Sequence, residues 1–250
     1  MSFWEGLLVL VAGIWAGTIN TVVGSGTLVS FPVLLGIGLP PVTANVSNTV
    51  GLFPGSFTGA WGYRRELAGQ RNRALLLSGA SALGAIIGAV LLLELPAGAF
   101  KAIVPILIVL ALLLVLFGSR ITAWLTRRGH GASERVGPAL WLVVLGTGVY
   151  GGYFGAAQGV LLMGFLGLFL AESLQRQNAL KNVLAGVVNF VAAVVFVATT
   201  HVDWAAAALI AVGSVIGGLL GARIGRRLSP TVLRATIVVV GLAAIVKLLV

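Results

Sequence analysis

An apolar segment of this chain is interrupted by small residues, and the interruption occurs twice. Residues 17–27 read GTINTVVGSGT, and 135 positions later residues 152–162 read GYFGAAQGVLL. Two further pairs recur in the same order: ANVSNTVG at 44–51 with ALKNVLAG at 179–186, and LGAIIGA at 83–89 with IGGLLGA at 216–222. We interpret these matches as a duplicated unit of roughly 115 residues. The fold must therefore hold two similar broken segments in corresponding places.

The composition predicts a multi-pass membrane protein. The chain is 59% hydrophobic and only 9% charged, whereas soluble domains carry about 25% charged residues. Several apolar runs reach the roughly 20 residues that span a bilayer core. In such a protein, a break repeated in both halves indicates where a substrate binds. The absence of cysteine excludes disulfides and thiolate chemistry.

We predict ten helical segments, five in each half. They cover about 3–23, 27–38, 43–62, 74–94 and 100–118, and then about 137–156, 159–171, 178–199, 204–222 and 231–249. The corresponding domains are a first transmembrane repeat over 1–118, a cytoplasmic linker over 119–135 and a second transmembrane repeat over 136–250. The segments 27–38 and 159–171 are short for a spanning helix, which needs about 20 residues. They are either half-helices or parts of tilted hairpins that span fully.

The basic residues predict the orientation of the segments. Of the 16 lysines and arginines, all but Lys101 and Lys247 lie in or beside four connections, which we place in the cytoplasm because basic residues concentrate there. The two halves then have opposite orientations. The predicted fold class is an all-α integral membrane protein with two inverted-topology repeats, in which segments 1 and 2 of each repeat form a hairpin or a broken pair.

The acidic residues exclude most catalytic chemistry. All of them are predicted at segment ends or in loops: Glu5, Glu66, Glu94, Glu134, Glu172 and Asp203. The two histidines, His130 and His201, are also in connections. We therefore expect no catalytic residues, no metal site, no cofactor and no enzyme. The basic loops favour contact with lipid headgroups of the bilayer over binding of nucleic acid.

The two breaks are a candidate site for an anion. A helix start leaves about four backbone N–H groups unpaired and carries a partial positive charge, and two such starts would converge near the midplane of the membrane. The same glycines also fit an alternative role, in which they only let helices pack closely. The candidate residues are Gly24, Ser25, Gly26 and Thr27 in the first break, and Gly155, Gln158 and Gly159 in the second.

Polar side chains within the third segments form a second constellation. Amides inside a membrane span need hydrogen-bond partners, so these side chains either line a polar path or join helices. Lys181 either faces the site or extends to the membrane interface. Because VSN in the first half faces KNV in the second, we do not expect equal roles for Asn48 and Lys181. The residues are Asn45, Ser47, Asn48, Lys181, Asn182 and Asn189, with Asn20 before the first break.

With the glycine-rich break, the ANVSN stretch, its counterpart ALKNVLAG and the glycine ladders, the chain resembles the TauE/SafE family of sulfite exporters. The resemblance implies a protein of the cell inner membrane. It also implies transport of a small sulfur-containing anion such as sulfite, sulfoacetate or another organosulfonate.

We therefore predict an anion transporter, most simply an exporter, that binds its substrate between the repeats and works by alternating access. An anion leaving an interior at about −100 mV gains about 2.3 kcal/mol per charge, so an exporter needs no coupling ion. An anion channel and a non-transporting membrane scaffold or assembly protein are the alternatives. The glycine ladders also allow a homo-oligomer.

Overall fold

The computed structural model describes residues 1–128, 136–224, 237–239 and 242, and most of this part of the chain is helical. Its helices follow the predicted segments. They are α1 (Phe3–Val22), α2 (Thr27–Gly36), α3 (Pro41–Gly62), α4 (Arg71–Glu94), α5 (Ala97–Arg128), α6 (Pro138–Tyr153), α7 (Gln158–Phe169), α8 (Leu174–Thr199) and α9 (Trp204–Ile224). The predicted segment 231–249 lies almost entirely outside the described residues.

Five of the described helices are long and apolar enough to cross a membrane: α1, α4, the 98–118 part of α5, α8 and α9. The helices α2 and α7 have 10 and 12 residues. At 1.5 Å per residue they extend only about 15 and 18 Å, against a hydrocarbon core of about 30 Å. Each is therefore half of a span.

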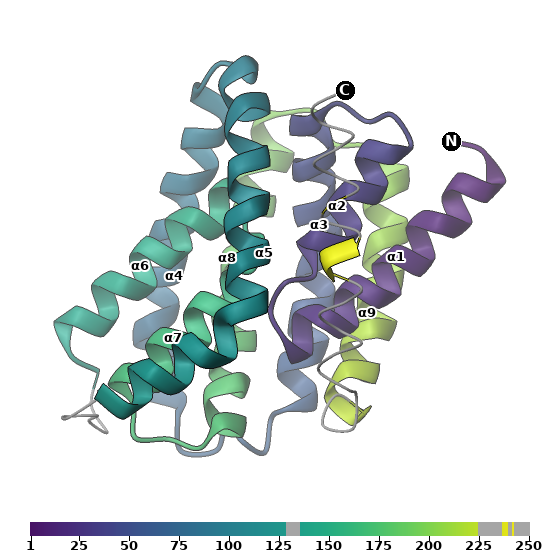
Figure 1. Ribbon diagram of the computed structural model, residues 1–250. Helices are drawn as coiled ribbons and strands as arrows, with labels where there is room; N and C mark the ends of the chain where they lie inside the picture. Colours follow the sequence, from purple (N-terminus) through teal and green to yellow (C-terminus); the bar gives the residue numbers. More distant parts are fainter. Residues whose placement is uncertain (129–135, 225–236, 240–241, 243–250) are drawn as a thin grey trace.

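Each short helix forms a hairpin with the helix before it. The hairpin of α1 and α2 opens toward the end of the bundle that holds the N-terminus, and the hairpin of α6 and α7 opens toward the opposite end (Figure 1). That opposite end also holds the connections 63–70 and 170–173 and the last residues of α9 (Figure 1). The connections in which basic residues are frequent thus gather at one end of the molecule.

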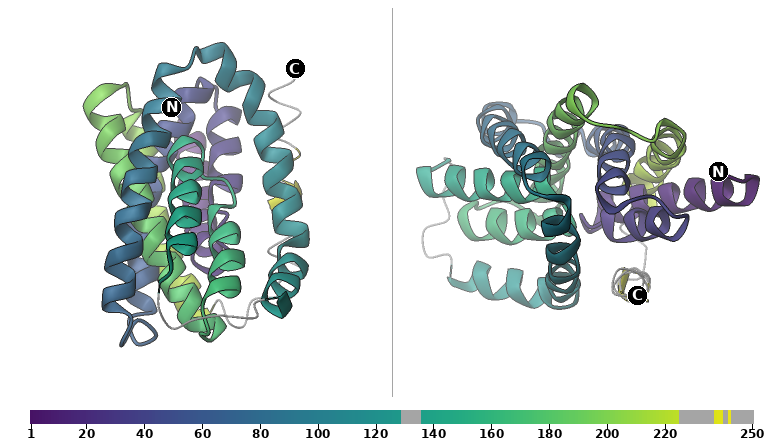
Figure 2. Two further views of the ribbon diagram at one scale, coloured as in Figure 1. Left: turned by 90° about the vertical axis from the view of Figure 1, so that its left-hand side faces the viewer. Right: turned by 90° about the horizontal axis from the view of Figure 1, so that it is seen from above.

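Helices of each half pack against helices of the other half. Seen from above, α4 lies beside α6, while α9 lies beside α1 (Figure 2). The most extensive helix contacts are those of α1 with α9, α4 with α6 and α3 with α9. Glycines permit this close approach, because a Cβ at Gly84 would overlap the backbone of α6 and a Cβ at Gly217 would overlap the backbone of α1.

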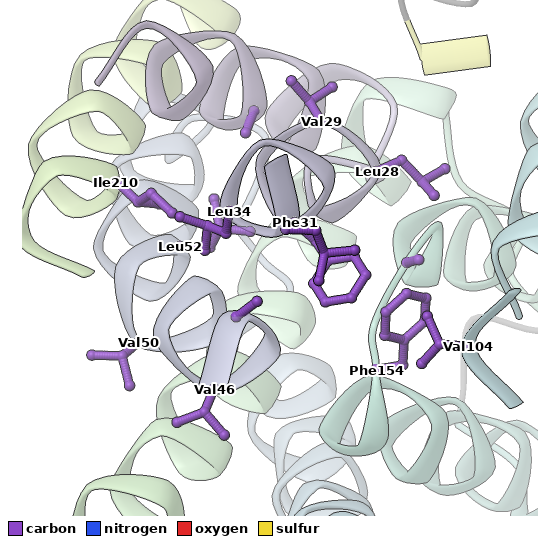
Figure 3. Packing of buried hydrophobic residues seen from close by; sticks show 14 of the residues in the cluster. Leu28, Val29, Phe31, Leu34, Val46, Val50, Leu52, Val104, Phe154 and Ile210 are labelled. Atoms are coloured by element: carbon purple, nitrogen blue, oxygen red, sulfur yellow. The ribbon is translucent and has the colours of Figure 1, made fainter. Parts of the chain in front are cut away.

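We define two helical bodies from these contacts. The α1 body contains α1, α2, α3 and α9, and the α6 body contains α4, α6, α7 and α8. They meet where α3 packs on α8. Both break regions contribute to an apolar layer beside this interface, in which the rings of Phe31 and Phe154 pack edge to face at 5.3 Å. Figure 3 shows this layer with residues of α2, α3, α5 and α9 around it.

The largest difference from the predicted boundaries is at the end of the fifth segment. The fifth segment was expected to end at 118, but α5 continues through Arg128. Residues 119–128 read SRITAWLTRR, which contains no glycine or proline to end a helix, and the first glycine follows at 129.

Candidate functional site

The two breaks touch each other in the middle of the molecule. The backbone N–H of Gly159, in the first turn of α7, donates a hydrogen bond of 2.9 Å to the carbonyl of Gly24, between α1 and α2. A Cβ on either glycine would overlap the Cα of the other. The contact therefore requires glycine on both sides, and it brings together the two segments that the sequence predicted to converge.

The first break combines a tight turn with unpaired donors. Gly24 has φ of +86°, a left-handed conformation that glycine adopts without strain. The backbone N–H groups of Ser25, Gly26 and Thr27 have no hydrogen-bond acceptor among the described residues. The hydroxyl of Ser25, a residue only 1% exposed, is also unpaired there. The start of α2 thus presents three amides and a hydroxyl in a buried place.

The second break has the same turn and a less polar lining. Gly155 has φ of +74°, and Ala157, which precedes α7, has φ of +58°. The side chain of Gln158 folds back against Gly151, and its amide nitrogen has no partner among the described residues. The positive-φ glycines Gly24 and Gly155 are 131 residues apart. The sequence match at an offset of 135 residues pairs Gly24 with Gly159 instead. At the break, the alignment of the two sequences therefore differs from the alignment of the two backbone conformations.

Lysine and asparagine side chains of α8 bind the carbonyls at the end of α1. The ammonium of Lys181 donates to the carbonyls of Asn20 and Thr21, at 3.0 Å each. The amides of Asn178 and Asn182 also donate to the Thr21 carbonyl, at 3.4 and 3.3 Å. A helix that ends inside a membrane leaves carbonyls without hydrogen-bond donors. Here side chains of α8, in the other body, supply the donors.

Lys181 is fully buried, and both of its hydrogen-bond partners are carbonyls rather than carboxylates. An ammonium has three donors, so one donor remains for a further acceptor. The aliphatic part of Lys181 lies against Gly159, the residue at which the breaks meet. The alternative that Lys181 extends to the membrane interface does not agree with this burial.

The end of α6 is capped from α3 in a related way. The amide of Asn45 donates to the carbonyl of Tyr153 at 3.0 Å. Nearby, the amide of Asn48 donates to the hydroxyl of Thr27 at 3.4 Å, and its oxygen accepts from Ser30. Asn48 therefore holds the start of α2, while Lys181 holds the end of α1, in line with the unequal roles expected from the sequence.

A third polar cluster joins the two bodies at α3 and α8. The hydroxyl of Ser56 accepts hydrogen bonds from the amides of Asn20 and Asn189, each at 3.2 Å. It also donates to the carbonyl of Leu52 at 3.2 Å. The candidate glycines, the lysine and the asparagines lie in or beside the region where the breaks meet. Ser47 does not join them, because its hydroxyl accepts a hydrogen bond of 2.9 Å from the backbone N–H of Asp203, before α9.

Sequence reasoning missed Ser56 and Asn178. Ser56 lies 133 positions before Asn189, and Asn178 lies the same distance after Asn45. The glycine ladders already match at this offset, at Gly84 and Gly217. Applying the offset of 133 to the polar residues of the third segments would have identified both.

The described carboxylates lie away from this region, at helix ends and in connections. Glu172 forms ion pairs with Arg73 and Arg176 at 2.8 and 2.5 Å. The hydrogen bond from Arg176, together with the one from Arg73, holds the pKa of the Glu172 carboxyl below its usual value. These pairs tie the connection before α8 to α4, within the α6 body. Among the described residues there is no cluster of acidic or histidine side chains that could hold a metal ion.

Two interrupted helices that meet inside an apolar bundle, with buried polar groups around the contact, are typical of membrane transporters. Comparison with known families agrees with this class. The chain belongs to the sulfite exporter TauE/SafE family, whose sequence model matches residues 9–248.

Curated relatives cover nearly all of the chain. It is 29% identical over 244 residues to the "Probable membrane transporter protein ORF9" of Sinorhizobium sp, covering 96% of this chain and 90% of that protein. It is 27% identical over 255 residues to the "Probable membrane transporter protein YfcA" of Escherichia coli K12, covering 98% and 89%. No solved structure matches the chain.

Proposed function

We infer that the protein exports a small sulfur-containing anion, which binds where the two breaks meet. The observation that carries this proposal is Lys181. Among the residues that the structure describes, it is a fully buried cation with one free donor and no carboxylate partner, beside a helix start with three unpaired amides. A buried charge is costly unless it is paired, so an anion would supply the missing opposite charge.

The unpaired groups at this place match the chemistry of an oxyanion. Sulfite and sulfonate oxygens accept several hydrogen bonds, and the amides of Ser25, Gly26 and Thr27, the Ser25 hydroxyl and the third Lys181 donor would each supply one. The positive end of α2 adds to the attraction. The description of the family as sulfite exporters supports sulfur as the central atom of the anion.

The proposed topology is an inverted repeat over 1–118 and 136–250. Its support is the opposite opening of the two hairpins (Figure 1) and the matched glycine contacts of α4 with α6 and of α9 with α1. The bodies that would rock against each other are not these sequence halves, because α4 and α9 are exchanged. We assign the moving units to the α1 body and the α6 body.

Alternating access requires the site to lie between moving units. The hydrogen bonds of Lys181, Asn45 and Asn189 each run from one body to the other. Rocking would break and remake these hydrogen bonds. They are few, and water would hydrogen-bond to the separated groups once the site opens. With basic connections on the cytoplasmic side of the inner membrane, the potential favours anion efflux by about 2.3 kcal/mol per charge at 100 mV.

Flux from proteoliposomes tests this function. Purified protein would be reconstituted with sulfite, sulfate, thiosulfate, sulfoacetate or taurine inside, and efflux followed at imposed potentials. We expect efflux of at least one of the anions, faster with the interior negative and strongly reduced in Lys181→Gln. No flux of any of them in correctly folded protein would reject the transporter and favour a scaffold. Unitary currents in planar bilayers would favour a channel instead.

A further inference from the structure

The carbonyls at the end of α1 have the geometry of a cation site. The groups Val23 N–H and Gly24 N–H both donate to Ile19, so the next carbonyls, those of Asn20 and Thr21, have no partner within their own helix. In transporters with interrupted helices, such carbonyls and helix C-terminal ends bind sodium. Here the two oxygens bind the ammonium of Lys181 instead.

Two side-chain oxygens of the residues at this helix end also lack partners. The side-chain oxygen of Asn178 and the hydroxyl of Thr21 are buried and have no hydrogen-bond partner among the described residues, and the Thr21 hydroxyl lies next to Gly59 of α3. The amide of Asn178 is already at the Thr21 carbonyl. Carbonyl oxygens at the negative end of a helix suit a hard cation, and a lysine ammonium meets the same requirement.

The equivalent end of α6 is capped by an amide. Its Tyr153 carbonyl accepts from the neutral amide of Asn45. A capping role alone would therefore be fulfilled by an amide, as it is in the second half. The ammonium that caps the first break does something further, because it places a positive charge where a soluble ion could otherwise bind.

We propose that the Lys181 ammonium occupies a monovalent cation site formed by the Asn20 and Thr21 carbonyls, and thereby replaces a coupling sodium ion. The fixed charge balances a bound anion without recruiting an ion from solution. A substitution that replaces Lys181 by a small residue removes the ammonium, leaves its space open and thereby creates a sodium site. The cation site itself does not depend on which anion is carried, and only the flux measurement below rests on the proposed function.

The test compares two substitutions that remove the same charge. Lys181→Ala leaves room for a sodium ion with water, whereas Lys181→Met fills the space with an apolar side chain of similar length. Thermal unfolding in detergent would be measured in sodium chloride and in choline chloride at equal ionic strength. We expect sodium to raise the melting temperature of Lys181→Ala by several degrees, with no response of the wild type or of Lys181→Met.

Two results would overturn the proposal: a folded Lys181→Ala protein that does not respond to sodium, or a wild type that responds as strongly as the variant. If Lys181→Ala does not give folded protein, Lys181→Ser provides the same space with a smaller change in polarity. A wild-type measurement adds a test without substitution, since replacing sodium by choline on both sides of proteoliposomes should leave anion flux unchanged. Absence of all flux would count against the proposed function, while the sodium response of the variant still decides the cation site.

Discussion

The two breaks share a backbone design but differ in chemistry. Both begin with a glycine of positive φ, Gly24 at +86° and Gly155 at +74°, and both are capped by asparagine from the other body. Among the residues that the structure describes, the first alone adds a lysine and leaves a serine hydroxyl unpaired. The two breaks therefore share the backbone geometry with which a helix ends inside the bundle, while the lysine caps one of them. We expect substrate recognition to depend mainly on the first break, and both breaks to be needed for the fold of the site.

The largest expected effect comes from the contact that the breaks share. Gly24→Val and Gly159→Val should each reduce anion flux to background while the protein still inserts, because a side chain on either glycine collides with the other backbone. Gly36→Val is the matched control, since nothing lies within 4 Å of a Cβ at that position. Flux in proteoliposomes and the amount of membrane-inserted protein are the measurements. Normal flux in both break variants would show that the contact is dispensable.

The second prediction separates the charged cap from the neutral one. Lys181→Gln should weaken anion affinity about ten- to hundredfold, the value of a hydrogen bond to a charged group. Asn45→Ala should act mainly on stability, with a loss of about 1–3 kcal/mol, because it leaves the buried Tyr153 carbonyl unsatisfied. Ligand titration and thermal unfolding of both variants measure the two quantities. An equal loss of affinity in both would mean that the two breaks contribute equally to recognition.

Much of the helical architecture could be predicted because hydrophobic length and small-residue breaks are local properties of the sequence. The α1–α2 interruption at 23–26 follows from VGSG alone. The extension of α5 to Arg128 was missed because polarity was taken as a sign of a linker, although polar residues continue a helix equally well outside the membrane. The exchange of α4 and α9 depends on contacts between distant segments, and no local pattern reports it.

The side chains of the candidate site could be predicted from the sequence, but most of the groups to which they hydrogen-bond could not. Amides and a lysine within apolar segments had to find hydrogen bonds, so Asn45, Lys181 and Asn189 could be named from residue type. Their acceptors are backbone carbonyls of the other body and the Ser56 hydroxyl. Every residue has a backbone carbonyl, so residue type does not show which carbonyl accepts a hydrogen bond. The capping of the interrupted helices could therefore not be inferred without coordinates.

The smallest expected effect concerns Ala157, which has φ of +58° where the first break has Gly26 at −58°. A left-handed conformation costs a non-glycine residue about 1–2 kcal/mol. Ala157→Gly removes that strain. It also loses a buried methyl group worth about 0.8 kcal/mol, and the greater entropy of the unfolded chain lowers the stability by about 0.5–1 kcal/mol. These contributions nearly cancel, so the stability should change by less than about 1 kcal/mol.

The neighbouring Ala156 is the matched control, because it is equally buried and does not have a positive φ. Ala156→Gly loses the methyl group and the chain entropy without relief of strain, which predicts a loss of about 1.5 kcal/mol. Thermal unfolding of the two variants under one condition gives the difference directly. Equal losses would mean that Ala157 is not strained in the folded protein, and the second break would then tolerate its left-handed turn as readily as a break built from glycine.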